Sequence, residues 1–571
     1  MTTALTSILR LVDDPAASFL FGRPVSSDPV SYRSLLVMVN WIADCTMRMR
    51  GHEKCPKWDG GTSRLPTRVV DLRSETVRLY VPPPGELSEY VALSYCWGCQ
   101  QPLVTTKARL ATYQQALPVD SLPATVQDAI SVTRALLIPF LWVDSLCIIQ
   151  DSAEDKAHEI ANMNNVYKNA FVTFSASRAK TCDDGFLGIQ EVTHERISRS
   201  ATIPIRCPNK QMGSAMLYPA RFVEADERAG KVPTDERAWT YQEFLLSPRV
   251  VSFYHDGLEF KCASGLFSDD GLKVEEIELR PPLMIRQTRL DALFYRQEAR
   301  SLLNRMFGRG SLSSSQRKHL RQLWVEIVNE YAVAALTDPD DKLPALSAIA
   351  SEFHRLWGGR YLAGLWDHQL INDLQWRVGI AVGGEPPTSR RVYQIPSWSW
   401  ASADRVGFGL FFAHDTDPTR KQSRRVRVLE CQVNLVSNVA QFSHVNGGQL
   451  TIQAPLKALD VEETWKRFGV DNDMRIGKFW SDFRWMNDGD LHGKLGIPPD
   501  CGSLFFLGLS MRAADSYETC GLVLLKSGDR RYERVGLYQV GDDLTRNVSA
   551  AQRSALSRWG KNYEVQTISI C

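Results

Sequence analysis

The feature that most constrains the fold is the segment at residues 140–151, FLWVDSLCIIQD. It begins as a continuous apolar run and then carries polar groups, of which Asp144 and Ser145 come first. An apolar run that lacks polar alternation is typical of a strand buried on both faces of a sheet. The sequence therefore predicts a central strand at residues 140–143, with polar side chains available for a functional site at its C-terminal end.

Strand-like and helical segments alternate on both sides of this strand. Strands are predicted at residues 90–96, 140–143, 171–176 and 249–254, and helices at residues 125–137 and 240–246 and from Ser152 onward. The Ser152 hydroxyl, three residues before an acidic side chain, is expected to cap its helix. This alternation predicts an α/β domain with a parallel sheet and right-handed crossovers.

The remaining sequence predicts three further parts. Helices are predicted at residues 290–303, 318–336 and 345–356; strands at residues 426–433, 449–453, 504–509 and 521–525; and a hairpin turn at residues 446–448, NGG. The chain is thus expected to comprise an N-terminal extension (1–65), the α/β domain (66–265), a mainly helical region with a Trp-rich end (266–420) and a β-rich C-terminal domain (421–571).

Composition limits the classes of partner. The net charge of +2 over 571 residues gives no global field for nucleic acid or an anionic membrane, and the longest apolar run, residues 135–143, is too short to span a bilayer. The 12 cysteines are scattered, which predicts reduced thiols and a cytoplasmic location, with the nucleus also open. Cys96 and Cys99 have half the spacing pattern of a zinc site but no second pair at ligand spacing, so no metal and no cofactor are predicted.

Four sequence blocks, in order, resemble the fungal heterokaryon incompatibility (HET) domain. They are YVALSYCWG at 90–98, DAI at 128–130 with LWVDSLCIIQ at 141–150, the residues Met163, Val166, Tyr167, Asn169 and Ala170, and RAWTYQE at 237–243. The resemblance covers residues 69–262, and it departs at Lys156, where many relatives have Trp. It implies an effector or signalling module in non-self recognition and regulated cell death, which acts through a protein partner or self-association. A family member retained in a metabolic gene cluster is an alternative.

HET domains have been compared with Toll/interleukin receptor (TIR) domains, which implies a TIR/flavodoxin-like parallel sheet. Some TIR domains cleave NAD with a Glu on the helix that corresponds to the one after Ser152. By this analogy Glu159 is a catalytic candidate, assisted by Asp144, and NAD is a candidate substrate of a glycohydrolase. Alternatively, Glu159 pairs with Lys156 on a solvated helix face, and Asp144 only caps the following structure.

Ligands of open parallel sheets bind beyond the carboxyl ends of the strands. The predicted ends place Trp97, Gly98 and Ser145 at this edge, where Trp97 could stack on a flat ring. Arg237 and Glu243, from the last block of the resemblance, are further candidates for ligand binding, although this block could equally be a structural clasp in which Arg237 pairs with Asp144.

Overall fold

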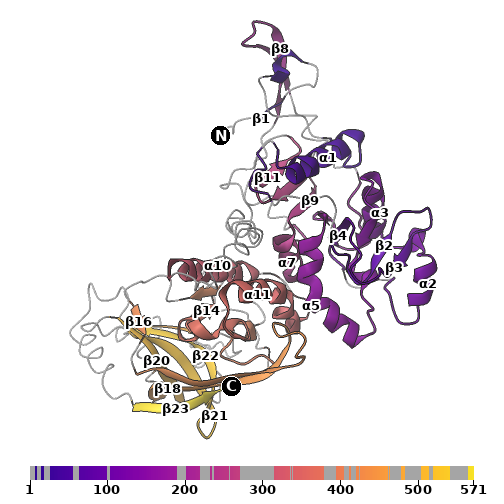
Figure 1. Cartoon of the computed structure of the whole chain (residues 1–571). Coiled ribbons are helices and arrows are strands. Elements are labelled where there is room, and N and C mark those ends of the chain that lie inside the picture. The colour runs from indigo at the N-terminus through magenta and orange to yellow at the C-terminus, as the bar shows by residue number, and fades with distance from the viewer. Residues whose placement is uncertain are drawn as a thin grey trace, which may run out of the picture. The chain divides into compact units, whose positions relative to one another are not determined.

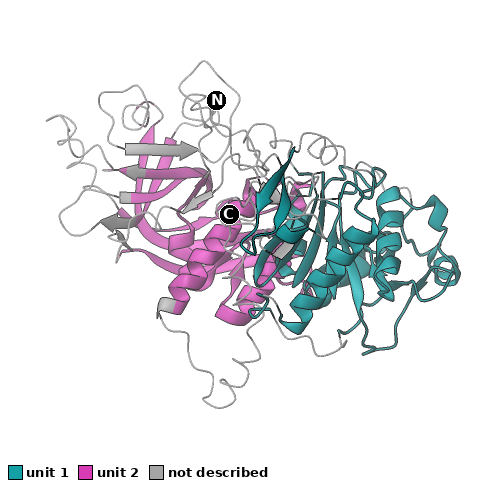
Figure 2. Ribbon diagram, turned by 90° about the horizontal axis from the view of Figure 1, so that it is seen from above, with its two compact units in different colours: residues 1–311 teal, residues 312–571 magenta. Residues whose placement is uncertain are grey.

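A computed structural model of the protein contains two compact units, residues 1–311 and residues 312–571 (Figures 1 and 2). The structure describes residues 7–9, 14–18, 26–49, 51–55, 63–98, 103–188, 201–218, 232–234, 237–255, 257–270, 314–332, 334, 336, 338–378, 392, 394–403, 410–412, 420–422, 425–460, 462, 464, 477–481, 503–512, 519–540 and 564–571. None of the helices within these ranges is long and apolar enough to cross a membrane.

The first unit is built on an eight-stranded mixed sheet. Its strands, in spatial order, are β11 (Gly265–Ser268), β10 (Gly257–Cys262), β9 (Arg249–Tyr254), β6 (Val172–Ser175), β4 (Tyr90–Ser94), β5 (Phe140–Trp142), β2 (Val69–Asp71) and β3 (Arg78–Tyr80). The four central strands, β9, β6, β4 and β5, are parallel, whereas the strands on either side are antiparallel. The prediction of a parallel α/β sheet is confirmed for this central part.

The central strands are buried along their whole length, as the lack of polar alternation predicted. In the middle of the sheet, Val91 of β4 lies between Leu141 of β5 and Val172 of β6. All three side chains are fully buried. At about 1.5–3 kcal/mol for each such side chain, their burial is a main source of stability in this layer.

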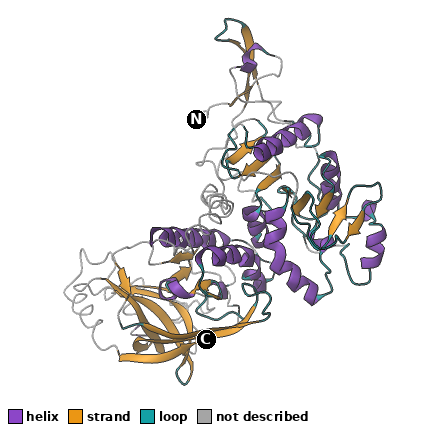
Figure 3. Cartoon of the chain, in the orientation of Figure 1, coloured by secondary structure: helices purple, strands orange, loops and turns teal. Residues whose placement is uncertain are grey.

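Helices pack around this sheet (Figure 3). They are α1 (Tyr32–Met47), α2 (Leu110–Gln115), α3 (Ala124–Ala135), α4 (Asp144–Cys147), α5 (Ala153–Asn169) and α7 (Ala238–Leu246). The cap prediction is confirmed, because Ser152 Oγ accepts a hydrogen bond from the Asp155 backbone N–H. A separate three-stranded sheet joins β1 (Ser7–Leu9), β8 (Met212–Tyr218) and β7 (Ala201–Arg206).

The second unit begins with helices around an aromatic core. Its described helices are α10 (Ser314–Ala332), α11 (Pro344–Trp357) and α12 (Leu370–Asp373), accompanied by the short strands β12 (Tyr361–Leu362), β13 (Leu365–Trp366), β14 (Trp376–Val378) and β15 (Leu410–Phe412). Trp324 meets Phe353 and Trp366 edge-on, at centroid distances of 5.1 and 5.5 Å. Two of the predicted helices are thus observed, and the one at residues 290–303 lies outside the described residues.

The C-terminal strands close into a barrel-like sheet. They are β16 (Arg420–Gln422), β17 (Arg427–Leu435), β18 (Val445–Asp460), β19 (Gly477–Ser481), β20 (Ser503–Arg512), β21 (Thr519–Gly528), β22 (Arg531–Val540) and β23 (Glu564–Ile570). The ring closes because the long strand β18 pairs with β23 and also with β20. The β-rich character predicted for this region is confirmed.

The predicted hairpin turn at residues 446–448 is wrong. These residues belong to β18, where Gly448 pairs with Val433 of β17. The connection lies earlier, and the Val436 N–H donates to the His444 carbonyl across its base. The glycines instead serve an irregularity in the ladder, since Gly447 has a φ of +82° and a Cβ on Gly448 would lie 2.7 Å from a carbonyl oxygen of β17.

Candidate functional site

The candidate site lies where three parallel strands end at the same edge of the sheet. From β4 the chain crosses to β5 on one side, and from β5 it returns to β6 on the other side of β4. In open parallel sheets, ligands bind in the crevice that such a reversal leaves beyond the carboxyl ends. Ser94 and Ser175 are the last residues of the neighbouring strands β4 and β6, and Asp144 follows β5 by two positions.

Asp144 is held by groups from two strand ends. Its Oδ2 accepts a hydrogen bond of 2.8 Å from the Trp97 indole Nε1, and its Oδ1 accepts one of 2.7 Å from the Ser145 backbone N–H. The Tyr95 hydroxyl donates to Ser145 Oγ over 2.9 Å, which ties the two segments together. Burial raises the pKa of Asp144 to about 6, although hydrogen bonding to Asp144 by Trp97, the Ser145 backbone and Tyr95, together with the charge of Arg237, acts in the opposite direction.

Glu243 is a second buried carboxyl group, and it interacts electrostatically with Asp144. It lies on α7, its residue is 5% exposed, and its Oε2 is enclosed without a hydrogen-bond partner among the described residues. Burial raises its pKa to about 8, and the charge of Asp144 adds to this rise, whereas the hydroxyls of Ser94 and Tyr167 and the charge of Arg237 oppose it. At neutral pH the pair therefore offers one carboxylate and one carboxylic acid, as general acid–base chemistry requires.

Arg237 and Gly98 complete the group of predicted residues around this pair. Arg237 is the N-cap residue of α7, is partly accessible, and lowers the pKa of both carboxyl groups. Gly98 is exposed and has a φ of +79°. A Cβ at this position would lie 2.9 Å from the Thr181 Cβ, so both the backbone conformation and the available space require glycine here.

Glu159 has different partners. It is buried in α5, at 1% exposure, and its Oε1 lies 3.4 Å from a guanidinium nitrogen of Arg68. The same guanidinium binds Asp155 at 2.6 Å and the Cys147 carbonyl at 2.6 Å. This arrangement favours a structural role for Glu159. The sequence offered Lys156 as the partner of a Glu159 ion pair, whereas in the structure Glu159 pairs with Arg68.

Sequence reasoning missed three residues of the site: Ser94, Tyr95 and Tyr167. The first two lie inside the block at residues 90–98, next to the predicted candidates, so their position was a usable signal. Tyr167 lies on the buried stripe of α5, where helical periodicity indicates only a core residue. Outside this region, the structure has a hollow lined by residues such as Arg360, Tyr361 and Phe442 of the second unit, and it shares no residue with the Asp144–Glu243 pair.

The comparison with known families matches this part of the chain. The family model described as heterokaryon incompatibility protein (HET) covers residues 90–243, from the first residue of β4 to Glu243 of α7. No curated protein and no solved structure matched the chain. Residues 90–243 therefore form a HET domain, the domain of the heterokaryon incompatibility family.

Proposed function

We propose that this protein acts in fungal heterokaryon incompatibility, as an effector or signalling module of non-self recognition and regulated cell death. The observation that carries the proposal is the HET family match over residues 90–243, which includes Asp144, Glu243 and the residues described around this pair. The second unit, with its helices and barrel-like sheet, is the candidate for sensing a protein partner or for holding the HET domain inactive.

The strand order supports a TIR-like interpretation of this domain. The parallel strands lie in the order β5, β4, β6, β9, which corresponds to 2-1-3-4 when they are numbered along the chain. Doubly wound flavodoxin-like sheets begin with the same order. TIR-like domains commonly work as assemblies, so the proposed signalling includes self-association of the HET domain, by analogy with innate immune signalling.

Expression in a filamentous fungus tests the proposal. The full chain is placed under an inducible promoter, and cell viability is followed with a vital dye while protein level is checked by immunoblot. We expect the wild-type chain to reduce viability and Asp144→Asn to abolish the effect at equal protein level. Asp151→Asn, an exposed site in the same segment, is the matched control and should behave as wild type. Unchanged viability with the wild-type chain, or full activity of Asp144→Asn, would refute the proposal.

A second candidate function is hydrolysis of NAD or a related nucleotide, and the Asp144–Glu243 pair favours it. Cleavage of the nicotinamide–ribose bond by water develops positive charge on the ribose, which the Asp144 carboxylate would stabilise. The Asp144 carboxylate would also accept the proton that the attacking water loses, while nicotinamide leaves as a neutral molecule. Glu243, protonated at neutral pH because its pKa is about 8, would donate a hydrogen bond to a ribose oxygen. In this second proposal the chemistry lies with Asp144 and Glu243, and Glu159 supports the fold through Arg68.

Nicotinamide release from NAD by the purified full chain tests this candidate. We expect turnover that is lost in Asp144→Asn and in Glu243→Gln and is retained in Glu159→Gln. The rate should be highest between about pH 6 and about pH 8, because one group must be ionised and the other protonated. Absence of release, or loss in Glu159→Gln alone, would refute this assignment.

A further inference from the structure

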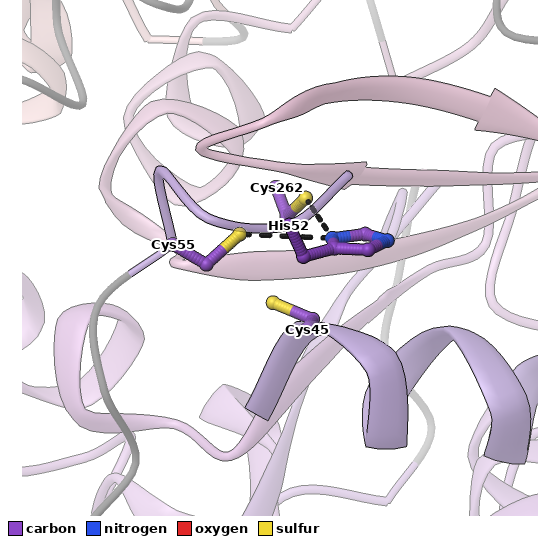
Figure 4. A group of neighbouring side chains, drawn as sticks. All are labelled: Cys45, His52, Cys55 and Cys262. Atoms are coloured by element: carbon purple, nitrogen blue, oxygen red, sulfur yellow. Dashed lines mark hydrogen bonds between the residues drawn. The ribbon is translucent and has the colours of Figure 1, made fainter. Parts of the chain in front are cut away.

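Three cysteines and one histidine from distant parts of the chain meet in the first unit (Figure 4). Cys45 lies in the last turn of α1, and His52 and Cys55 lie in the loop that follows. Cys262 is the last residue of β10 and comes more than 200 positions later. One ligand atom from each of the four residues lies within 4.8 Å of every other.

The local backbone brings the first three residues together. α1 ends at Met47, and its C-cap residue Arg48 adopts the left-handed conformation and donates its N–H to the Asp44 and Cys45 carbonyls. The chain then turns back through hydrogen bonds from the His52 N–H to the Met49 carbonyl and from the Cys55 N–H to the His52 carbonyl. These turns direct the side chains of Cys45, His52 and Cys55 toward the end of β10 (Figure 4).

The cluster is closed off from solvent. Cys45 and Cys262 are 0% exposed, and His52 and Cys55 are 2% exposed. The His52 ring stacks on Phe267 of β11 at a centroid distance of 4.6 Å. Beside it, Trp41 of α1 stacks on Phe260 of β10 at 5.7 Å. Four potential ligands thus converge in a buried site flanked by aromatic rings.

The distances from the imidazole nitrogen to two of the sulfurs fit a single tetrahedral ion. Zinc binds sulfur at about 2.3 Å and imidazole nitrogen at about 2.0–2.1 Å, so a tetrahedral shell separates a sulfur from a nitrogen by about 3.5 Å and two sulfurs by about 3.8 Å. His52 Nδ1 lies 3.2 Å from Cys262 Sγ and 3.7 Å from Cys55 Sγ. Figure 4 shows this nitrogen facing the sulfur atoms. The imidazole is therefore already oriented as a ligand, through Nδ1.

We propose that Cys45, His52, Cys55 and Cys262 bind one structural zinc ion. A site with three thiolates and one imidazole matches the soft donor set that zinc prefers, and the oxygen ligands that calcium or magnesium require are lacking among these four side chains. An iron–sulfur cluster would need its ligands farther apart, because more than one iron lies between them. The Ser264 hydroxyl, 3.3 Å from Cys55 Sγ, is placed to orient that ligand from the hairpin between β10 and β11.

The position of the ion gives it a role in the fold. Two of its ligands come from the loop after α1 and one from α1 itself, whereas the fourth comes from β10, next to β9 in the large sheet. The zinc would therefore fasten the segment that precedes the HET domain to the strands that follow it. All four coordination positions are filled by protein side chains, which is the arrangement of a structural rather than a catalytic zinc site.

Metal analysis of the full chain tests the proposal. The protein is purified without chelators, and zinc is measured by plasma mass spectrometry. We expect one zinc per chain in the wild type and its loss in Cys262→Ser and His52→Ala. Cys207→Ser is the matched control, because Cys207 is a buried cysteine of the same unit outside the cluster, and it should retain zinc. His52→Cys should also retain zinc, since it supplies a fourth thiolate, and so separates loss of a ligand from loss of packing.

Two further measurements complete the test. Replacement of zinc by cobalt should give the visible absorption of a tetrahedral thiolate site in the wild type and in Cys207→Ser, but not in Cys262→Ser. Removal of the metal with a strong chelator should increase hydrogen exchange in α1. Wild-type protein without zinc, zinc retained in both Cys262→Ser and His52→Ala, or a disulfide among the three cysteines in protein purified under reducing conditions would each overturn the proposal.

Discussion

Replacing Glu243 by Gln should change how the stability of the first unit depends on pH. The substitution keeps the size of the side chain and its capacity for hydrogen bonds but removes the ionisable proton. In the folded protein the pKa of Glu243 is raised from 4.5 to about 8, with burial as the first cause. A carboxyl group with a higher pKa in the folded state binds its proton more tightly there than in the unfolded chain. Its contribution to stability is therefore present at low pH and is lost as the pH rises from about 4.5 to about 8.

The magnitude follows from linkage. Each pH unit inside this window corresponds to about 1.4 kcal/mol for one proton, and the slope decreases close to the folded pKa. Between about pH 6 and about pH 8, the free energy of unfolding of the first unit should fall by about 2 kcal/mol on account of Glu243. Asp144 contributes little over this interval, because its pKa of about 6 leaves it largely ionised through most of it.

Urea denaturation read by pulsed hydrogen exchange and mass spectrometry provides the assay. Peptides from α7 and β4 report the transition of the first unit, independently of the second unit. The wild type should lose about 2 kcal/mol more than Glu243→Gln between about pH 6 and about pH 8. Glu154→Gln, at an exposed position of α5, is the control and should follow the wild type. Parallel pH dependence in the wild type and Glu243→Gln would refute the inference that burial holds the proton on this group.

Three further predictions concern other parts of the structure. Arg68→Met should destabilise the first unit by about 3–5 kcal/mol in the same urea assay, because it leaves two buried or partly buried carboxylates without their guanidinium. Gly521→Ala should prevent accumulation of soluble, folded second unit, as judged by limited proteolysis, because its Cβ would lie 1.8 Å from a carbonyl oxygen of β20. Asp144→Ala should impair function more than stability, whereas Trp142→Ala should cost about 3–5 kcal/mol of core packing; equal losses of soluble protein would contradict this distinction.

Several elements of the first unit could be predicted because their patterns are local. The strand predicted at residues 249–254 is observed as Arg249–Tyr254, and the helix predicted at residues 125–137 is observed as Ala124–Ala135. Continuous apolar runs and an amphipathic stripe are properties of neighbouring residues, so one sequence suffices. The flanking strands β2, β3, β10 and β11 were not predicted, because their places in the sheet depend on antiparallel pairing with a neighbouring strand. The boundaries at residues 65, 265 and 420 remain predictions.

Residues of the candidate site could be predicted only where they directly follow the end of a predicted strand. Asp144 and Trp97 were placed at one edge because both follow parallel strands, and the hydrogen bond between them agrees with that placement. The partner of Glu159 could not be predicted, because Arg68 lies just before β2 and reaches α5 only through the tertiary fold. The interaction of Glu243 with Asp144 depends on how α7 packs, which no spacing in the sequence reveals.

The cysteine and histidine cluster was missed for a related reason. The spacing of Cys45, His52 and Cys55 is a usable signal for three ligands, but the fourth ligand is in a strand far along the chain. Small zinc modules have two pairs of closely spaced Cys or His residues, and a search for that pattern does not detect a site whose fourth ligand is so distant. Cys262 reaches the end of α1 because β10, which pairs with β9 in the large sheet, packs against this helix.

The docking of α1 onto β10 has a consequence for synthesis on the ribosome. His52 and Cys262 are separated by 210 positions. The loop after α1 therefore cannot contact β10 until the ribosome has translated the whole HET domain. At about 5–20 residues per second, this delay is about 10 to 40 s. During that time the apolar face of the helix and its thiols stay uncovered in the nascent chain, where chaperones and oxidants can reach them.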